Sequence, residues 1–150
     1  MKLPLFLALT ASAFVCVMGG DRKPDVAAPS LRIHPKVFSM VDCWISDSKA
    51  PVVTEINLDA VKANGNEFDE SVIVQEDGWT RCPGADGQGF QRYRVLEVKG
   101  NRYKVEYQDN GGGTLTSASI IECTVESREI RRKGKPASIR VLRVLSCDAK

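Results

Sequence analysis

The segment RYRVLEVKGNRYKVEYQD, residues 92–109, alternates apolar and polar side chains on both sides of a Gly-Asn pair. Such alternation is typical of β-strands, and Gly100 can adopt the positive φ that a two-residue hairpin turn requires. The turn sets the cross-strand pairs. On one face they are Val98 with Tyr103, Leu96 with Val105 and Arg94 with Tyr107, and on the other face Glu97 with Lys104. We therefore expect an antiparallel hairpin at the centre of the fold, with tyrosines packed in its core.

Strand-like segments flank this hairpin on both sides. The expected strands cover residues 37–45, 68–75 and 115–123 and the two halves of 124–147, which meet at a Lys-Gly-Lys-Pro turn. A loop rich in Gly, Asp and Pro is expected over residues 76–90. Residues 54–64 fit either a strand or a helix. Thr54 as a cap and Gly65 as a stop favour a short helix there.

The chain has 150 residues, of which 43% are hydrophobic, and a net charge of +2, which is typical of one soluble domain. Its apolar run from Leu3 to Met18 is too short for a membrane span and is typical of a secretory signal peptide. We expect a signal peptide over residues 1–20, a mobile leader over 21–36 and a single β-rich domain over 37–150. The leader contains the only histidine, His34. The expected location is extracellular, with no membrane span.

Removal of residues 1–20 leaves four cysteines: Cys43, Cys82, Cys123 and Cys147. They form no C-x-x-C pair and lack the spacing of zinc ligands, so two disulfides are expected in an oxidising compartment. The hairpin over residues 124–147 brings Cys123 near Cys147, which favours that pair and leaves Cys43 with Cys82. The expected fold class is α+β, mostly β: a small disulfide-pinned antiparallel sheet or barrel with one short helix.

Charge is distributed unevenly along the chain. Residues 41–90 carry a net charge of −7 and residues 91–150 a net charge of +6, so the two halves should attract each other. In the basic hairpin seven cations oppose Glu129 alone; they are Arg128, Arg131, Arg132, Lys133, Lys135, Arg140 and Arg143. Such cations protect an exposed ribbon from edge pairing, and they also predict contacts with phosphates or another anionic surface. The acidic half is least able to neutralise the four cations nearest the turn, which are Arg131, Arg132, Lys133 and Lys135.

Residues 43–123 resemble the secreted fungal ribonuclease family and its inactive, effector-type relatives. The matching pieces are Cys43, the expected helix over 55–64, PGADGQGFQRYRVLEV at residues 83–98 and IIECT at 120–124. The resemblance implies Cys43 paired with Cys123, Cys82 paired with Cys147, and Arg92 or Arg94 as a phosphate contact. That family cleaves RNA with histidine and glutamate as acid and base, but no histidine follows Cys43 here. The likeness is therefore to the non-catalytic members, which act by binding.

Residues 92–123 also resemble the hairpin core of small SH3 or Tudor-type barrels. Those modules bind ligands in aromatic cages, to which Tyr93, Tyr103 and Tyr107 would correspond. In the expected register, however, the last two tyrosines share a face with apolar strand residues. Packing in the core is therefore the expected role of these rings.

The sequence offers little for catalysis. The glycine-rich residues 84–89 precede a strand and are read as a loop rather than a phosphate cradle, and no cofactor or metal is expected. Trp79, on the expected loop, is a candidate interface anchor. We expect a small secreted non-enzymatic binding protein, effector- or inhibitor-like, whose macromolecular partner is in the first place a protein. The alternative is a catalytically inactive ribonuclease-like protein that binds RNA or another polyanion through the basic hairpin.

Overall fold

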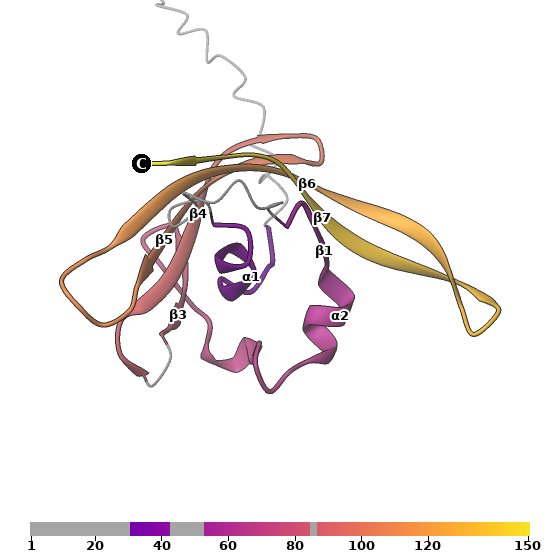
Figure 1. The fold of residues 1–150 in the computed structure, drawn as a ribbon, viewed down its shortest axis with the longest axis horizontal. Coiled ribbons are helices and arrows are strands. Elements are labelled where there is room, and N and C mark those ends of the chain that lie inside the picture. The colour runs from indigo at the N-terminus through magenta and orange to yellow at the C-terminus, as the bar shows by residue number, and fades with distance from the viewer. Residues whose placement is uncertain (1–30, 43–52, 85–86) are drawn as a thin grey trace, which may run out of the picture.

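The computed structural model describes residues 31–42, 53–84 and 87–150. In this part of the chain seven antiparallel strands form one curved sheet in the order β1-β7-β6-β5-β4-β3-β2 (Figure 1). The strands are β1 (Glu55–Asn57), β2 (Val74–Glu76), β3 (Trp79–Pro83), β4 (Phe90–Lys99), β5 (Arg102–Asn110), β6 (Ser117–Arg132) and β7 (Lys135–Ala149). The helical elements are α1 (Lys36–Ser39), α2 (Leu58–Ala63) and the 3-10 turn η1 (Glu70–Val72). The prediction of a mostly β, antiparallel fold is confirmed.

The central hairpin forms from β4 and β5, joined at Gly100, whose φ is 61°. Val98 faces Tyr103 and Glu97 faces Lys104, as predicted. The other two predicted pairs are wrong, because a β-bulge between Val95 and Glu97 inserts one extra residue into β4. In consequence Val95 rather than Leu96 faces Val105. Beyond the bulge the pairs are Tyr93 with Tyr107 and Arg94 with Glu106.

The core lies on the concave side of the sheet, where α1 is seated (Figure 1). The ring of Phe38 on α1 lies 4.8 Å from that of Tyr93 and 6.1 Å from that of Tyr107, and all three side chains are fully buried. The strand predicted over 37–45 is therefore wrong where the structure describes it. Val37 and Val41 lie one helical turn apart and are both buried, which is the spacing of a helix face. We call this concave face the inner face.

Residues 31–36 belong to the domain, although they were expected to lie in the mobile leader. Leu31 and Ile33 are buried in the core. Tyr93 Oη donates a hydrogen bond to the Leu31 carbonyl at 2.6 Å and lies 3.4 Å from the Ile33 amide. The domain therefore begins before Val37. The rest of the predicted leader and the signal peptide lie outside the described residues.

Residues 54–64 contain both of the structures that their pattern allows. Ile56 is buried in β1, opposite Leu142 of β7, and the helix α2 begins directly afterwards. The helix cap is Asn57 rather than Thr54: its side chain accepts hydrogen bonds from the amides of Asp59 at 3.1 Å and Ala60 at 3.0 Å. A short helix is therefore confirmed, with a later start than predicted.

The chain between α2 and β4 departs furthest from prediction. Residues 68–75 form the η1 turn and only the start of β2, not one continuous strand. The expected loop over 76–90 contains β3, because Asp77 and Gly78, with φ of 49° and 77°, make a two-residue turn between β2 and β3. An Asp-Gly pair is a strong hairpin signal. It places Trp79 on a strand instead of on a flexible loop.

Both cysteine pairings considered above are wrong, since Cys82 and Cys123 are free and buried. The two-residue turn at Lys133 and Gly134 sets Cys123 opposite Val144, and a register shift beyond Cys123 sets Cys147 opposite Ile121. The two cysteines of the hairpin are thus diagonal neighbours, which are roughly 7–8 Å apart in a sheet and too distant for a disulfide. Cys43 lies outside the described residues.

The basic hairpin is formed by β6 and β7, with Lys133 and Gly134 in its turn at φ of 50° and 76°. Pairing of β6 with β5 ends at Thr124, and β1 covers β7 only from Val141 to Arg143. Beyond these points the two strands protrude from the body as a free ribbon (Figure 1). Among the described helices, none is long and apolar enough to cross a membrane.

Candidate functional site

The end of the protruding ribbon carries four exposed cations, which we call the ribbon tip: Arg131, Arg132, Lys133 and Lys135. Arg132 stands directly opposite Lys135 across the two strands. Like charges in such pairs repel each other. None of the ion pairs within residues 31–42, 53–84 and 87–150 involves a cation of the ribbon tip. The tip is therefore a concentrated positive charge that the described part of the chain leaves open to a partner.

The other three predicted cations of the hairpin are occupied by acidic groups. Arg128 binds Glu55 with two hydrogen bonds of 2.9 and 3.0 Å, and Arg143 Nε lies 3.3 Å from the same carboxylate. Arg140 donates its backbone amide to Asp59 at 2.8 Å and adds a side-chain contact at 3.3 Å.

These bonds lower the pKa of both acids. The hydrogen bond from Arg128 is the main cause for Glu55, and the Arg140 amide is the main cause for Asp59. The seven predicted cations thus divide into three that fasten β1 and α2 to the ribbon and four that remain at its tip.

Trp79 lies in a second cationic surface, the arginine–aromatic face, which consists of Trp79, Arg81, Phe90, Arg92 and Arg94 on β3 and β4. The guanidinium carbon of Arg92 lies 4.3 Å from the centre of the Trp79 ring and 4.6 Å from that of Phe90. Arg94 lies 4.8 Å from the Trp79 ring, and Arg81 lies 5.4 Å from Phe90. Cation–π contacts of this length order the arginines without neutralising them.

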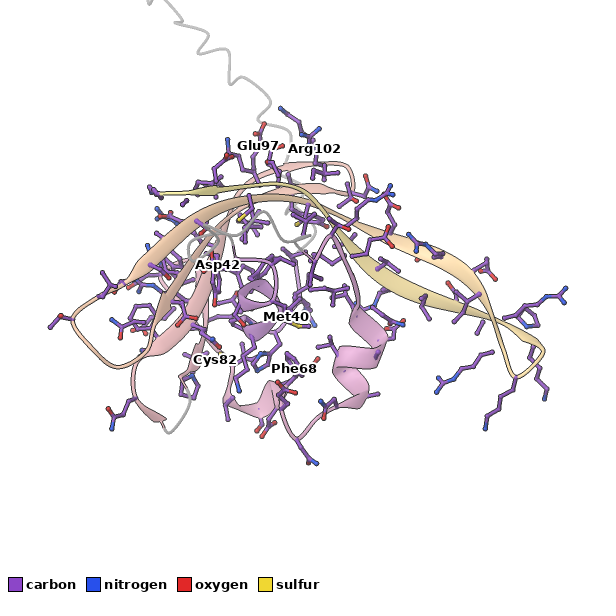
Figure 2. The ribbon with its side chains drawn as sticks, viewed as in Figure 1. Met40, Asp42, Phe68, Cys82, Glu97 and Arg102 are labelled. Carbon is purple, nitrogen blue, oxygen red and sulfur yellow. The ribbon has the colours of Figure 1, made fainter. Side chains whose placement is uncertain are left out.

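The alternation of strand residues places this surface on the convex side of the sheet, the outer face. Tyr93 and Cys82 are buried on the inner face. Their strand neighbours Arg92, Arg94 and Arg81 therefore point outward. Figure 2 shows the same division for labelled residues: Cys82, Asp42 and Phe68 lie on the concave side, whereas Glu97 and Arg102 lie on the convex side.

The three arginines differ in their polar partners. Arg94 Nε donates to Glu106 at 2.8 Å, and Lys150 Nζ binds the same carboxylate at 2.8 Å. Glu106 is only 3% exposed, and its pKa is lowered, chiefly by the hydrogen bond from Lys150. Arg92 instead binds the neutral oxygen of Gln108 through two nitrogens, at 3.0 and 2.8 Å. Only Arg94 is therefore held by a carboxylate.

Arg81 stands directly opposite Arg92 across β3 and β4. No ion pair among the described residues includes either of them. Two like charges in directly opposed positions destabilise a sheet by a few tenths of a kcal/mol up to about 1 kcal/mol. This part of the surface is thus electrostatically unfavourable as long as no anion is bound.

The three tyrosines form no aromatic cage. Tyr93, Tyr103 and Tyr107 are 1%, 8% and 0% exposed and pack in the core, as the sequence predicted. Burial, together with the nearby Asp109, raises the pKa of Tyr107 well above its usual value. Their role in the described structure is packing.

His34 is buried rather than solvated. Its Nδ1 accepts a hydrogen bond from the Lys36 amide at 3.2 Å, and its ring meets the edge of Phe68 at 5.6 Å. Burial, and secondarily the Lys36 charge, lowers its pKa below 6.5. Burial also raises the pKa of the Cys123 thiol to about 12, so this thiol remains protonated at neutral pH. In the described segments no group of three metal-binding side chains is assembled.

Sequence reasoning found the ribbon tip and Trp79 but missed the arrangement around the tryptophan. The Asp-Gly turn at residues 77–78 was the signal that would have placed β3 beside β4 and Trp79 beside the arginines. Comparison of the chain with family models, with curated proteins and with solved structures finds no match.

Proposed function

We propose that this chain is a small secreted, non-enzymatic binding protein, effector- or inhibitor-like, that recognises acidic groups on a macromolecular partner through the ribbon tip. The division of the basic hairpin carries the proposal. Arg128, Arg140 and Arg143 are used internally, whereas the four tip cations project from the body on a free ribbon. If the cations served only to hold the halves of the chain together, they would not continue beyond the reach of Glu55 and Asp59.

A tip of this kind recognises charge more than shape. Exposed, closely spaced cations raise association rates with polyanions and contribute affinity that falls steeply with ionic strength. A protein with an acidic surface and a nucleic acid both offer such groups. The second candidate, a catalytically inactive RNA-binding protein, is favoured by Arg92 and Arg94, which lie on the Trp79 ring.

The test compares a tip variant with a control variant of equal charge. The tip variant is Arg131→Gln, Arg132→Gln, Lys133→Asn and Lys135→Gln; asparagine is chosen at position 133 because it tolerates the positive φ there. The control removes the four cations of Lys62, Lys99, Arg102 and Lys104, which face Glu70, Glu97 and Glu122.

Binding to heparin and to labelled single-stranded RNA is measured for both variants. The tip variant should lose several-fold in affinity for each polyanion at low salt, with an unchanged unfolding temperature, since exposed charges contribute little to stability. The control should stay close to wild type. An equal loss in both variants, or no loss in the tip variant, contradicts the proposal and reduces the tip to an edge-protecting surface.

Export and disulfide pinning are part of the same proposal, with a pairing other than those expected from the sequence. Asp42 accepts a hydrogen bond from Ser119, and Ser119 faces Ala149 on β7, two residues from Cys147. Cys43 follows Asp42 directly in the sequence, and we propose that it pairs with Cys147. Among the described residues, Cys82 and Cys123 are free thiols, and Cys147 is not one of them.

Peptide mapping of the exported protein without reduction tests this pairing. We expect a peptide that links Cys43 to Cys147, with Cys82 and Cys123 alkylated as thiols only after unfolding. A link from Cys147 to Cys82 or Cys123, or a fully reduced chain, contradicts it.

A further inference from the structure

The arginine–aromatic face combines two features that the ribbon tip lacks: flat rings and arginines held in fixed planes. We propose that it is a second binding site, which takes single-stranded nucleic acid by stacking bases on its rings and guanidinium planes and by holding phosphates with Arg81 and Arg92. The inference rests on the proposed function to the extent that the partner is a polyanion, and it names the class of that polyanion.

The first argument comes from the planar groups. Trp79 and Phe90 are half-buried and share the guanidinium of Arg92, at 4.3 and 4.6 Å from the two ring centres. Arg94 adds another planar cation 4.8 Å from the Trp79 ring. Rings and guanidinium groups are the two surfaces on which proteins stack unpaired bases. Rings and cations follow each other along β3 and β4, so more than one base can be accommodated.

The second argument comes from the charges. Arg81 and Arg92 oppose each other directly and have no acidic partner among the described residues, whereas Arg94 is balanced by Glu106. Two carboxylates are diagonal neighbours in register: Glu76 on the exposed edge strand β2 is diagonal to Arg81, and Glu106, which faces Arg94, is diagonal to Arg92. A phosphate between Arg81 and Arg92 would remove their repulsion. Because Gln108 fixes the Arg92 plane, little side-chain freedom is lost when a phosphate binds.

The third argument excludes other polyanions by their chemistry. In a nucleic acid duplex the base faces are already stacked on one another and cannot reach the rings. A sulfated glycan satisfies the arginines but has no aromatic face. An acidic peptide likewise supplies carboxylates and leaves Trp79 and Phe90 without a stacking partner. Single strands alone offer phosphates and free base faces together.

The experiment uses the fluorescence of Trp79 as a direct signal. Trp44→Phe leaves Trp79 as the single tryptophan of the chain. In this background oligouridine, a heparin fragment of similar charge and polyglutamate are titrated against the protein. Oligouridine should quench Trp79 at saturation, because a stacked base contacts the indole. Heparin and polyglutamate should bind more weakly to this face and leave the emission unchanged.

Two substitutions separate stacking from charge. Trp79→Leu should weaken oligouridine binding roughly 5- to 150-fold and leave heparin affinity unchanged, whereas Trp79→Phe should retain most of the affinity. Arg92→Gln should weaken oligouridine binding and make its salt dependence less steep. The matched control is Arg102→Gln, an outer-face arginine that is paired with Glu122 away from this surface. Thermal unfolding is measured for each variant. If Trp79→Leu does not fold, the comparison of Arg92→Gln with Arg102→Gln and the quenching of Trp79 by oligouridine serve as the test.

Equal oligouridine affinity in the wild type and in Trp79→Leu overturns the inference, as does oligouridine binding without quenching. Quenching by polyglutamate at matched affinity also overturns it, and indicates an acidic protein as the partner. A different result contradicts the proposed function: the tip variant would then retain its heparin affinity, independently of the effect of substitutions at Trp79. If the tip variant loses heparin affinity but Trp79→Leu does not change oligouridine affinity, the proposed function stands and this inference is wrong.

Discussion

The environment of His34 in the structure differs from the one that its sequence context predicts. Placed between prolines and charges, it reads as a solvated leader residue, yet in the fold it is only 7% exposed and packs on Phe68. Its pKa is lowered by burial, so the unfolded chain binds a proton more readily than the folded one. The stability that neutral His34 contributes to the fold is therefore fully present above pH 6.5 and is lost progressively as the pH falls below that value.

The pH dependence can be assigned to His34 because the chain has only one histidine. We expect the free energy of unfolding in urea to be lower at pH 5.5 than at pH 7.5 for the wild type. His34→Asn, whose side-chain oxygen can take the place of Nδ1 as acceptor for the Lys36 amide, should be nearly insensitive to pH over this interval. The same slope in both proteins would show that His34 titrates freely in the folded state.

Residue types predicted the core well and the pairings poorly. Tyr103 and Tyr107 are buried as their alternation with polar residues indicated. The partner of Leu96 was wrong because a bulge in β4 adds one residue and shifts every later pair. The break in alternation at Val95 and Leu96, two adjacent apolar residues, marks that bulge, although no glycine or proline does. The partner of Cys123 was wrong because the turn uses only the first two residues of Lys-Gly-Lys-Pro, which sets Cys123 opposite Val144.

At the scale of elements, the short helix α2 is stabilised by its cap. Asn57 accepts hydrogen bonds from two helix amides, and α2 in turn carries Asp59 to Arg140 and Leu58 to the core. We expect Asn57→Ala to lower the free energy of unfolding by about 1 kcal/mol. Asn57→Asp should retain the stability, because an aspartate caps equally well and its charge suits a helix start.

Urea unfolding of the two Asn57 variants beside the wild type checks this. If Asn57→Ala matched Asn57→Asp, the cap would contribute nothing and the contacts of Leu58 and Asp59 alone would hold α2.

Elements with strong turn signals were predictable, and those governed by distant contacts were not. The Gly-Asn pair predicted the β4–β5 turn correctly. The Lys-Gly-Lys-Pro segment predicted the β6–β7 hairpin, although only its first two residues form the turn. Residues 37–41 alternate like a strand but form the end of α1 and the turn that follows it, because Val37, Phe38 and Val41 cover the concave sheet only in helical spacing. The short strand β1 forms because it pairs with β7, a partner some eighty residues further along the chain that no local pattern shows.

For the whole molecule, the uneven distribution of charge has two consequences. The acidic first half supplies Glu55 and Asp59, which hold the base of the ribbon, as the opposite net charges predicted. Among the described residues, cations without an ion pair gather in two places: the arginine–aromatic face near the β2 edge of the sheet and the ribbon tip at the far end of the β6–β7 hairpin (Figure 1). The two surfaces proposed to bind anionic groups therefore lie on opposite sides of the body.

The most direct test of this account is the salt dependence of binding to single-stranded RNA. The dissociation constant is measured over a series of salt concentrations for the wild type, the tip variant and its charge-matched control. Four phosphate contacts at the tip contribute about −3 to the slope of log affinity against log salt. We predict a slope for the tip variant that is less negative than wild type by about 3, with the control parallel to wild type. Superimposed slopes for all three proteins would contradict the central claim that the ribbon tip binds polyanions.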